Sequence, residues 1–197
     1  MSNVDTVNPV LLDALSDAGT IILEYVQTIG GDMDEEVLQN TPSRFGKGYA
    51  ELLQGYTEDP SSVMKVFIQE TKSTSLILVK DIPFYSLCAH HALPFFGTIS
   101  IGYIPNGKIL GLSKFKRLVN IFAQRLQVQE NLTQEISQAL NDNLKPLGVM
   151  VVSRARHLCF EMRGVNTPGS ETVVSSLCGV FEQEAEARQE FLSLLKA

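Results

Sequence analysis

The segment TISIGYIPNGKIL, Thr98 to Leu110, decides how this chain folds. From Thr98 to Tyr103, apolar side chains alternate with small or polar ones at a period of two, which is typical of a strand with one buried face. Pro105-Asn106-Gly107 then interrupts the pattern with residues that favour tight turns. The segment therefore predicts a sheet strand that ends in a turn.

Periodic segments on both sides of this strand predict further helices and strands. We expect helices from Asn8-Pro9 to Gly30-Gly31, from Thr41-Pro42 to about Gly55, from Asp59-Pro60 to about Thr71, from Ser113 through Leu126, from about Leu132 to Asn143, and from Ala185 to Leu195. We expect strands at Leu76 to Val79, Val149 to Val152 and Leu158 to Met162. Helices on one side of an antiparallel sheet make the predicted fold class α+β.

The order of these elements predicts one structural unit with two parts. Residues 1–72 are expected to form an N-terminal helical extension, because every periodic segment in them has the helical spacing. Residues 73–197 are expected to form the catalytic domain, in which strands and helices are mixed. The sequence shows no internal repeat and no low-complexity linker that would separate the parts.

The composition excludes several classes of function. With 44% hydrophobic and 19% charged residues among 197, the chain is expected to bury a substantial core. The net charge of −6 argues against a broad nucleic-acid surface, although a local basic pocket can still bind a small anion. No apolar run reaches the roughly 18–20 residues that span a bilayer, and MSNVDTVNPV lacks the features of a signal peptide. We expect a cytoplasmic protein that binds neither nucleic acid nor membrane.

The segment SLCAHHALPFFG, Ser86 to Gly97, holds one of the three cysteines and two of the three histidines. Cys88 and His91 are three residues apart and can approach one metal ion from a turn, which leaves His90 free for proton transfer. The alternative is a buried patch. Three cysteines cannot all pair within one chain, and a cytoplasmic setting disfavours disulfides. Cys178 has no histidine nearby and is expected to be packed in the core.

The segment HLCFEMRG, His157 to Gly164, adds a second cysteine. In a strand, the four polar side chains of this segment would share one face: His157, Cys159, Glu161 and Arg163. The thiolates of Cys88 and Cys159 with the imidazole of His91 make three ligands and leave a fourth position open, which is typical of a catalytic zinc site. The alternative is two buried thiols and histidines with ordinary partners.

The segment GLSKFKRL, Gly111 to Leu118, concentrates cations where a helix is expected to begin: Lys114, Lys116 and Arg117. A helix start disfavours positive charge, so the pattern indicates a bound anion, with Ser113 as cap or hydroxyl donor. Arg44 and Lys47, also three residues apart, would add to such a pocket. The alternative is a solvated basic turn and ordinary surface charges.

Four segments together resemble one family. They are TPSRFGKGYAELLQGY (41–56), DIPFYSLCAHHALPFFG (81–97), IGYIPNGKILGLSKFKRLVNIFAQRLQVQENLT (101–133) and HLCFEMRGV (157–165). In a single collinear order from about Thr41 to the C-terminus, they closely resemble GTP cyclohydrolase I. The resemblance implies a tunnelling fold (T-fold) that assembles into a ring-shaped homodecamer, with active sites at the subunit boundaries.

The resemblance also implies a reaction and a role for each matching residue. GTP and water would give 7,8-dihydroneopterin triphosphate and formate, the first step of folate and pterin biosynthesis. The zinc ligands would be Cys88, His91 and Cys159, and the catalytic residues His90, His157 and Ser113. The substrate-binding residues would be Glu130, which reads the guanine edge, its neighbour Gln129, and the triphosphate and ribose group Lys114, Arg117, Arg163, Arg44 and Lys47.

The chain departs from the family pattern beside the metal site. Ala89 stands where the family has Glu, and Ala92 where it has a larger apolar residue. An acidic group beside an imidazole raises its basicity, so its loss is expected to slow proton transfer. Glu161 is a possible replacement for that charge. Ala89 therefore keeps two alternatives open: a paralogue with arrested or altered purine-ring opening, and a ring protein that binds GTP or pterin as a regulator.

Two further parts of the chain fit the family less closely. Ser153-Arg154-Ala155-Arg156 is more basic than the family pattern and would meet the triphosphate or a neighbouring chain. The acidic segment to about Asn40 resembles the family least, and a regulatory protein that binds the ring would have this segment as its target.

Overall fold

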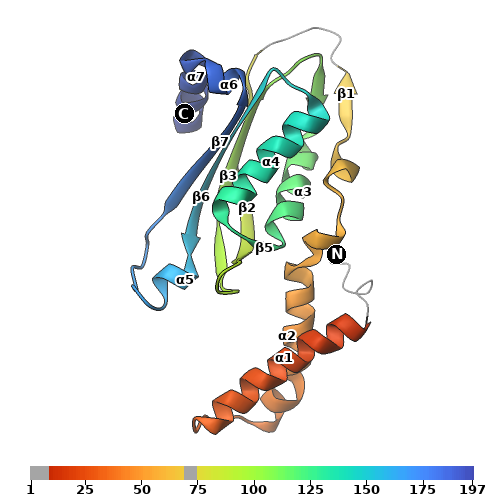
Figure 1. Ribbon diagram of the computed structural model, residues 1–197, viewed down its shortest axis with the longest axis vertical. Helices are drawn as coiled ribbons and strands as arrows, with labels where there is room; N and C mark the ends of the chain where they lie inside the picture. The colour runs from red at the N-terminus through yellow and green to blue at the C-terminus, as the bar shows by residue number, and fades with distance from the viewer. Residues whose placement is uncertain (1–8, 69–74) are drawn as a thin grey trace. The chain divides into compact units, whose positions relative to one another are not determined.

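The computed structural model describes residues 9–68 and 75–197, and the chain divides into two compact units between Gln54 and Gly55. The first unit is a pair of helices, α1 (Pro9–Thr28) and α2 (Glu35–Leu52). The second unit contains the sheets and the remaining helices (Figure 1). The functional division expected between residues 1–72 and 73–197 stays a prediction. Within the described residues, no helix combines the length and the apolar character needed to cross a membrane.

Small residues allow the two helices of the first unit to pack closely. A Cβ atom on Gly46 of α2 would lie 2.4 Å from Ser16 Oγ of α1, and one on Gly19 would lie 3.0 Å from Phe45 Cβ. The predicted start of α1 at Pro9 is confirmed, whereas the expected cap, Asn8, lies outside the described residues. Small side chains at these crossings are therefore required by the backbone separation.

Helix α2 begins earlier than the sequence pattern predicted. Its cap is Asp34, whose carboxylate accepts a hydrogen bond from the Val37 N–H at 2.9 Å. Glu35 and Glu36 follow in the first turn, where negative charge is favourable. The prediction of a start at Thr41-Pro42 is wrong, because this acidic cap starts the helix upstream and Pro42 lies inside it. The helix ends at Leu52 and is followed by a short 3₁₀ helix, η2 (Gln54–Thr57).

The second unit is built on a five-stranded sheet in the order β5-β2-β3-β6-β7. The strands are β2 (Ile77–Cys88), β3 (Pro94–Ile104), β5 (Leu126–Gln127), β6 (Gly148–His157) and β7 (Thr172–Gly179). All neighbours pair antiparallel except β5, which runs parallel to β2. A separate pair joins β1 (Val66–Ile68) to β4 (Lys108–Leu110). The expected α+β class is thus confirmed.

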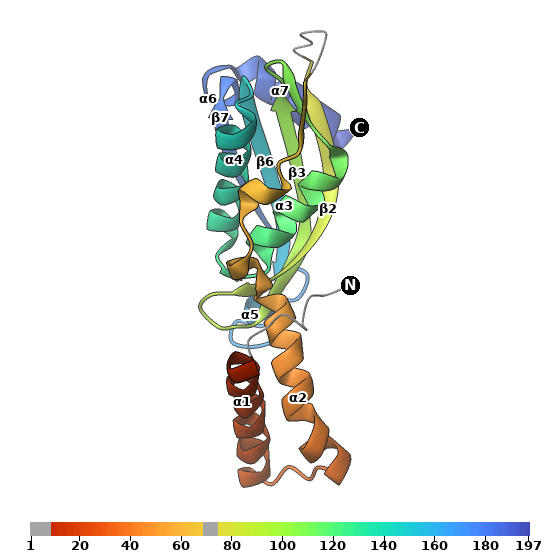
Figure 2. The ribbon, with the colours of Figure 1, turned by 90° about the vertical axis from the view of Figure 1, so that its right-hand side faces the viewer.

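Helices cover both faces of this sheet. α3 (Leu112–Ala123) and α4 (Gln129–Leu144) pack on one face, where Phe115, Leu132 and Val151 belong to the main core (Figure 2). On the other face, Met150 and Val152 of β6 pack with Phe191 of α7 (Ala185–Lys196). The expectation of helices on one side only is wrong, because alternate residues of β6 are apolar on both faces.

Three segments differ from the predicted elements. The helix expected from Asp59-Pro60 is one 3₁₀ turn, η3 (Pro60–Val63), and its expected end at Thr71 lies outside the described residues. The strand expected at 158–162 is a helical turn, α5 (Leu158–Glu161). The strand after the turn at Gly107 (φ +73°) pairs with β1 and does not fold back on β3. Strand β7 and the short helix α6 (Val180–Gln183) were not predicted.

The pairing of β3 with β6 depends on a glycine. Gly97 lies opposite Ala155, and a Cβ atom there would be 1.9 Å from the Arg154 carbonyl oxygen and 2.9 Å from Ala155 Cα. Both obstacles are backbone atoms, so they cannot turn aside as a side chain can. Two residues away in the same ladder, Phe95 lies opposite His157. Any residue larger than glycine would therefore push β6 away from β3 close to His157.

We predict that Gly97→Ala lowers the free energy of unfolding by about 3 kcal/mol, since the added methyl group must displace backbone. Gly48→Ala is the control, because a Cβ there meets nothing within 4 Å and alanine favours a helix interior by about 1 kcal/mol. Urea denaturation of both variants measures the difference. Equal stability of Gly97→Ala and the wild type would contradict the close approach of β3 and β6.

Candidate metal centre and adjoining pocket

A tight turn between β2 and β3 positions Cys88 and His91. The Cys88 N–H donates to the Leu93 carbonyl at 2.8 Å, and the Ala92 N–H donates back to the Cys88 carbonyl at 2.8 Å. Ala92 has a φ of +53°, which closes the turn in the left-handed region. The Ala89 N–H donates to the Gln127 carbonyl of β5 at 2.9 Å and ties the turn to the sheet. This backbone arrangement directs both side chains to one side.

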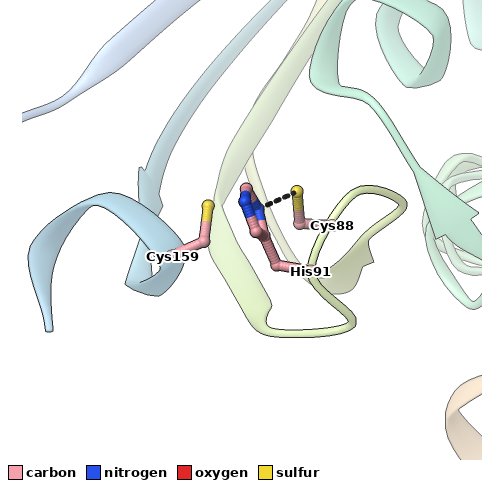
Figure 3. A group of neighbouring side chains, drawn as sticks. All are labelled: Cys88, His91 and Cys159. Carbon is pink, nitrogen blue, oxygen red and sulfur yellow. Dashed lines mark hydrogen bonds between the residues drawn. The ribbon is translucent and has the colours of Figure 1, made fainter. Parts of the chain in front are cut away.

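The third member of the cluster comes from a distant part of the sequence. Cys159 lies in α5, the helical turn that follows β6, and its side chain points toward Cys88 and His91 (Figure 3). The ligand atoms of the three residues all lie within 4.8 Å of one another, and Cys88 Sγ is 3.6 Å from His91 Nδ1. Cys88 is buried, Cys159 partly buried and His91 exposed. The structure thus brings together the three residues that sequence spacing selected.

The donor set of this cluster fits a metal ion. Two thiols and one imidazole are the ligand types of zinc sites, and three protein ligands leave a position for a further ligand. Burial raises the pKa of the Cys159 thiol, as does the nearby Cys88, while the Arg163 guanidinium acts in the opposite direction. Two thiols held together in a partly buried place favour a cation that replaces their protons.

His157 ends β6 next to the cluster and is held from two sides. Its ring stacks on Phe95, with centroids 4.8 Å apart and planes 2° from parallel. Its Nε2 lies 2.9 Å from Gln129 Oε1. Burial lowers the pKa of His157, opposed by the negative charges of Glu130 and Glu161. The ring is therefore fixed in place, and its environment favours the neutral form.

A pocket of about 270 Å³ opens beside Cys159. Its lining residues come from α4, β6, α5, the loop before β7 and the start of β7: Gln129, Glu130, His157, Cys159, Phe160, Ser170 and Thr172. Glu130 is exposed in the first turn of α4, so its carboxylate is accessible to a ligand. A planar ring that entered the pocket would meet the Glu130 carboxylate, the His157 imidazole and the Cys159 thiol.

His90 lies at the edge of this arrangement. It is exposed, and its Nδ1 is 3.9 Å from Cys88 Sγ, slightly farther than that of His91. The two histidine rings are 6.1 Å apart. His90 therefore lies beside the cluster, and its expected role in proton transfer stays a prediction.

The basic residues of the predicted anion site do not join the cluster within one chain. α3 begins after β4 and ends just before β5, whose Gln127 pairs with Cys88. Lys114 and Arg117 near the helix start are thus roughly 9–14 Å along the axis from the end that adjoins Cys88. The cap of α3 is Gly111, so the expectation of Ser113 as the cap is wrong, whereas its alternative role as a hydroxyl donor stays a prediction.

Other predicted cations have separate positions. Lys116 is held to β2, because its Nζ donates to the Pro83 carbonyl at 2.5 Å. Arg44 and Lys47 lie on α2 in the first unit, where Arg44 forms an exposed ion pair with Glu36 at 2.6 Å. Arg163 follows α5 and is exposed near Cys159. Of the predicted phosphate ligands in the second unit, Arg163 alone is thus placed beside the cluster.

Glu161 is tied to Arg156 by two hydrogen bonds. Arg156 Nε donates to Glu161 Oε1 at 2.8 Å and Nη2 donates to Oε2 at 2.5 Å. The guanidinium holds the pKa of Glu161 below its usual range. Because residues 158–161 are helical, the predicted shared strand face of His157, Cys159 and Glu161 is wrong. The pair fastens α5, which carries Cys159, to the end of β6.

Sequence reasoning missed several residues of the pocket. Phe160, Ser170 and Thr172 line it, and Ser153 and Thr133 support Gln129 from behind. The β-branched residues at the start of TVVSSLCG, Thr172 to Val174, were a signal for β7 and hence for Thr172. Cys178 was expected to be packed, and it is partly buried with Sγ 3.9 Å from Ser137 Oγ.

Comparisons with known proteins give a consistent result. A family model described as GTP cyclohydrolase I matches residues 19–196, which extends the resemblance upstream of Thr41. GTP cyclohydrolase 1 of Leptospira biflexa is 48% identical over 176 residues, covering 89% of this chain and 96% of that protein. GTP cyclohydrolase 1 of Campylobacter curvus is 46% identical over 176 residues, with 89% and 93% covered.

Two further matches are more distant. GTP cyclohydrolase 1 of Dictyostelium discoideum is 44% identical over 185 residues, covering 94% of this chain and 80% of that protein. Among solved structures, the archaeosine synthase QueF-Like in its apo form covers 55% of this chain and 97% of its own, with 23% identity and a TM-score of 0.42. At that score the structural likeness carries no argument.

The Arg156–Glu161 pair leads to a prediction about metal affinity. Arg156→Ala and Glu161→Ala should each weaken Zn²⁺ binding about tenfold, because either change releases the turn that carries Cys159. The double variant should lose little more than each single variant, since both remove the same contact. Competition with a chromophoric chelator measures the affinities.

Arg154→Ala is the matched control. Arg154 is an exposed arginine two residues from Arg156, and its ion-pair partner is Glu171, at 3.6 Å, outside α5. Its loss should leave Zn²⁺ affinity unchanged. Wild-type affinity in Glu161→Ala would show that the pair does not position Cys159.

Proposed function

This chain belongs to the GTP cyclohydrolase I family, and we propose that it opens the imidazole ring of GTP beside a zinc ion held by Cys88, His91 and Cys159. Its activity is that of GTP cyclohydrolase I. The overall reaction balances as GTP plus one water giving 7,8-dihydroneopterin triphosphate plus formate. C8 of the purine leaves as formate, and two ribose carbons enter the new ring.

One observation carries this proposal. The ligand atoms of two cysteines and one histidine converge within 4.8 Å at the edge of a pocket that also contains His157 and Glu130. The cluster alone could be explained as packed thiols, and the pocket alone as an ordinary surface cleft. Together they supply what purine-ring hydrolysis requires: a site for a Lewis acid, a group that transfers protons and a group that binds guanine.

The cluster fits zinc better than harder metals, because thiolates select zinc and other soft ions while Mg²⁺ and Ca²⁺ prefer oxygen. Bound zinc would supply Lewis-acid chemistry and activate water at neutral pH. The turn at Ala92 and the Arg156–Glu161 pair hold the ligands from opposite sides of the site. Ligand preorganisation by the protein thus accounts for the local backbone strain.

The pocket residues take separate roles toward the purine. The Glu130 carboxylate accepts hydrogen bonds from the N1 and amino groups of guanine, a pair of donors that adenine does not present. His157 takes up and returns a proton during ring opening, and His90 serves the later ribose steps. Gln129, which the sequence resemblance placed on the guanine, has its side chain directed at His157.

Binding of the triphosphate requires several cations. Within one chain, the predicted phosphate ligand that lies beside the cluster is Arg163. We place the remaining cations, Lys114 and Arg117 with Ser113, on a neighbouring copy of the chain. Arg44 and Lys47 are proposed to join the same phosphate site. This arrangement puts each active site at a subunit boundary and agrees with a T-fold ring, proposed to be a homodecamer.

Ala89 bears on the rate. It is exposed between Cys88 and His90, so no acidic side chain stands beside these histidines in the turn. Glu161 does not supply the missing negative charge, because its carboxylate is paired with the Arg156 guanidinium. The expected consequence is slower proton transfer with unchanged GTP binding.

Identification of the products tests the proposed function. Protein loaded with Zn²⁺ should convert GTP to 7,8-dihydroneopterin triphosphate and formate, detected by mass spectrometry and a formate assay. Cys159→Ser should lose both zinc and activity, whereas Cys178→Ser, the matched control outside the cluster, should keep both. Removal of zinc by a chelator should abolish turnover, and its return should restore it.

A ring-opened intermediate without the pterin would contradict full cyclohydrolase activity and indicate an arrested paralogue. Intact GTP with bound zinc would indicate a binding or regulatory role. Formation of the product by zinc-free protein would exclude the metal from the mechanism.

Mixed oligomers test the shared site. Cys159→Ser and Lys114→Ala/Arg117→Ala should each be inactive alone. After the two are unfolded together and reassembled at equal ratio, about a quarter of wild-type activity should return, because that share of sites combines an intact cluster with intact cations from another chain. Absence of any recovery, in oligomers shown to be mixed, would place the whole site within one chain.

A further inference from the structure

The amide of Gln129 is buried among polar groups behind the pocket. Gln129 is 1% exposed at the start of α4, facing β6 and β7. Its side-chain nitrogen lies 3.0 Å from Ser153 Oγ, 3.3 Å from the Ser153 carbonyl oxygen and 3.1 Å from the Thr172 carbonyl oxygen. Its side-chain oxygen lies 2.9 Å from His157 Nε2. Every polar atom of the amide thus has a protein partner.

These partners determine the orientation of the amide. Carbonyl oxygens only accept hydrogen bonds, so the NH₂ group of Gln129 must face Ser153 and Thr172. A flipped amide would set its oxygen against two carbonyl oxygens and leave a buried repulsion. Oε1 of Gln129 therefore faces His157.

The hydroxyl groups around the amide agree with this direction. Thr133 Oγ1 donates to the Gln129 backbone carbonyl at 2.7 Å, which uses its only proton. In the 2.7 Å contact between Thr133 Oγ1 and Ser153 Oγ, Ser153 must then be the donor. Ser153 Oγ keeps a lone pair for the Gln129 NH₂ group. In these four hydrogen bonds, the assignments of donor and acceptor are all consistent with one another.

The hydrogen bond between Gln129 and His157 determines which nitrogen of His157 carries the proton. Gln129 Oε1 can only accept, so His157 Nε2 must donate. In the neutral imidazole the lone pair then lies on Nδ1, and no hydrogen bond within the described residues occupies that nitrogen. The stack on Phe95 holds the ring plane, and a half-turn of the ring within that plane would replace Nε2 by a carbon atom and break the hydrogen bond to Gln129.

We propose that Gln129 is a positioning residue that fixes His157 as the Nε2–H tautomer and makes Nδ1 its proton acceptor. Resting on the proposed function, this assigns Gln129 to the proton-transfer step, in place of the guanine contact that its neighbour Glu130 provides. Ser153, Thr133 and Thr172 act behind it by preventing the amide from turning. Substrate binding should depend on this network much less than turnover does.

The test combines a spectroscopic and a kinetic readout on the intact, zinc-loaded protein. With ¹⁵N-labelled histidine, measured where His157 is neutral, Nε2 should show the shift of a protonated nitrogen and Nδ1 that of an unprotonated one. Gln129→Met, similar in size but without a hydrogen-bonding amide, should give averaged shifts from two tautomers. Its kcat for GTP should fall about 10- to 100-fold with KM nearly unchanged.

Gln127→Met is the matched control. Gln127 is also a buried glutamine, 5% exposed, but its amide donates to the Phe122 carbonyl and to Glu135 and does not contact His157. The Gln127→Met variant should lose about as much folding stability as Gln129→Met, and it should keep the wild-type ¹⁵N histidine spectrum. Should Gln129→Met not fold, Ser153→Ala removes one anchor of the amide and should show the same changes in weaker form.

A protonated Nδ1 in the wild type would overturn the proposal. So would a Gln129→Met variant with wild-type shifts and kcat but a raised KM, which would return Gln129 to a guanine contact. Because the ¹⁵N spectrum is read without turnover, a protein with the expected tautomer and no cyclohydrolase activity would refute the proposed function and leave the tautomer assignment standing.

Discussion

The functional site depends on the antiparallel pairing of β3 with β6. This pairing sets His157 against Phe95 and places α5, with Cys159, beside the turn that carries Cys88 and His91. The two halves of the metal cluster are about seventy residues apart in sequence and approach each other because these strands do. Gly97 permits the approach, since a side chain there would meet the backbone of β6. A packing constraint on one glycine is thus also a constraint on the chemistry.

The polar groups around the site have hydrogen-bond partners. These partners determine which atom donates and which accepts, as well as how far apart the groups lie. The Arg156–Glu161 pair neutralises two charges while it fixes α5, and the Gln129 network satisfies its donors and acceptors in one consistent order. An isolated polar group in this position would cost stability. As connected sets, these groups restrict the site to one arrangement, which a reaction with several proton transfers requires.

Much of the site could be predicted from sequence because its ligands follow local rules. Cys88 and His91 are close in sequence and lie in a turn, so their spacing already limits their separation. The sequence analysis placed Cys159 in the cluster by assuming a strand with a polar face. That assumption was wrong, because residues 158–161 form a helical turn. The partnership of Gln129 with His157 was not predictable, since it depends on how α4 packs against β6 and β7. The early start of α2 was signalled by Asp34, but Pro42 gave a competing signal.

X-ray absorption at the zinc K edge tests the central claim most directly, because it reports the atoms bound to the metal without requiring turnover. The account predicts two sulfur neighbours at about 2.3 Å and one imidazole nitrogen at about 2.0–2.1 Å, completed by one light ligand. A wild-type spectrum with one sulfur neighbour or none would show that Cys88 and Cys159 do not share the metal, and would contradict the site described above.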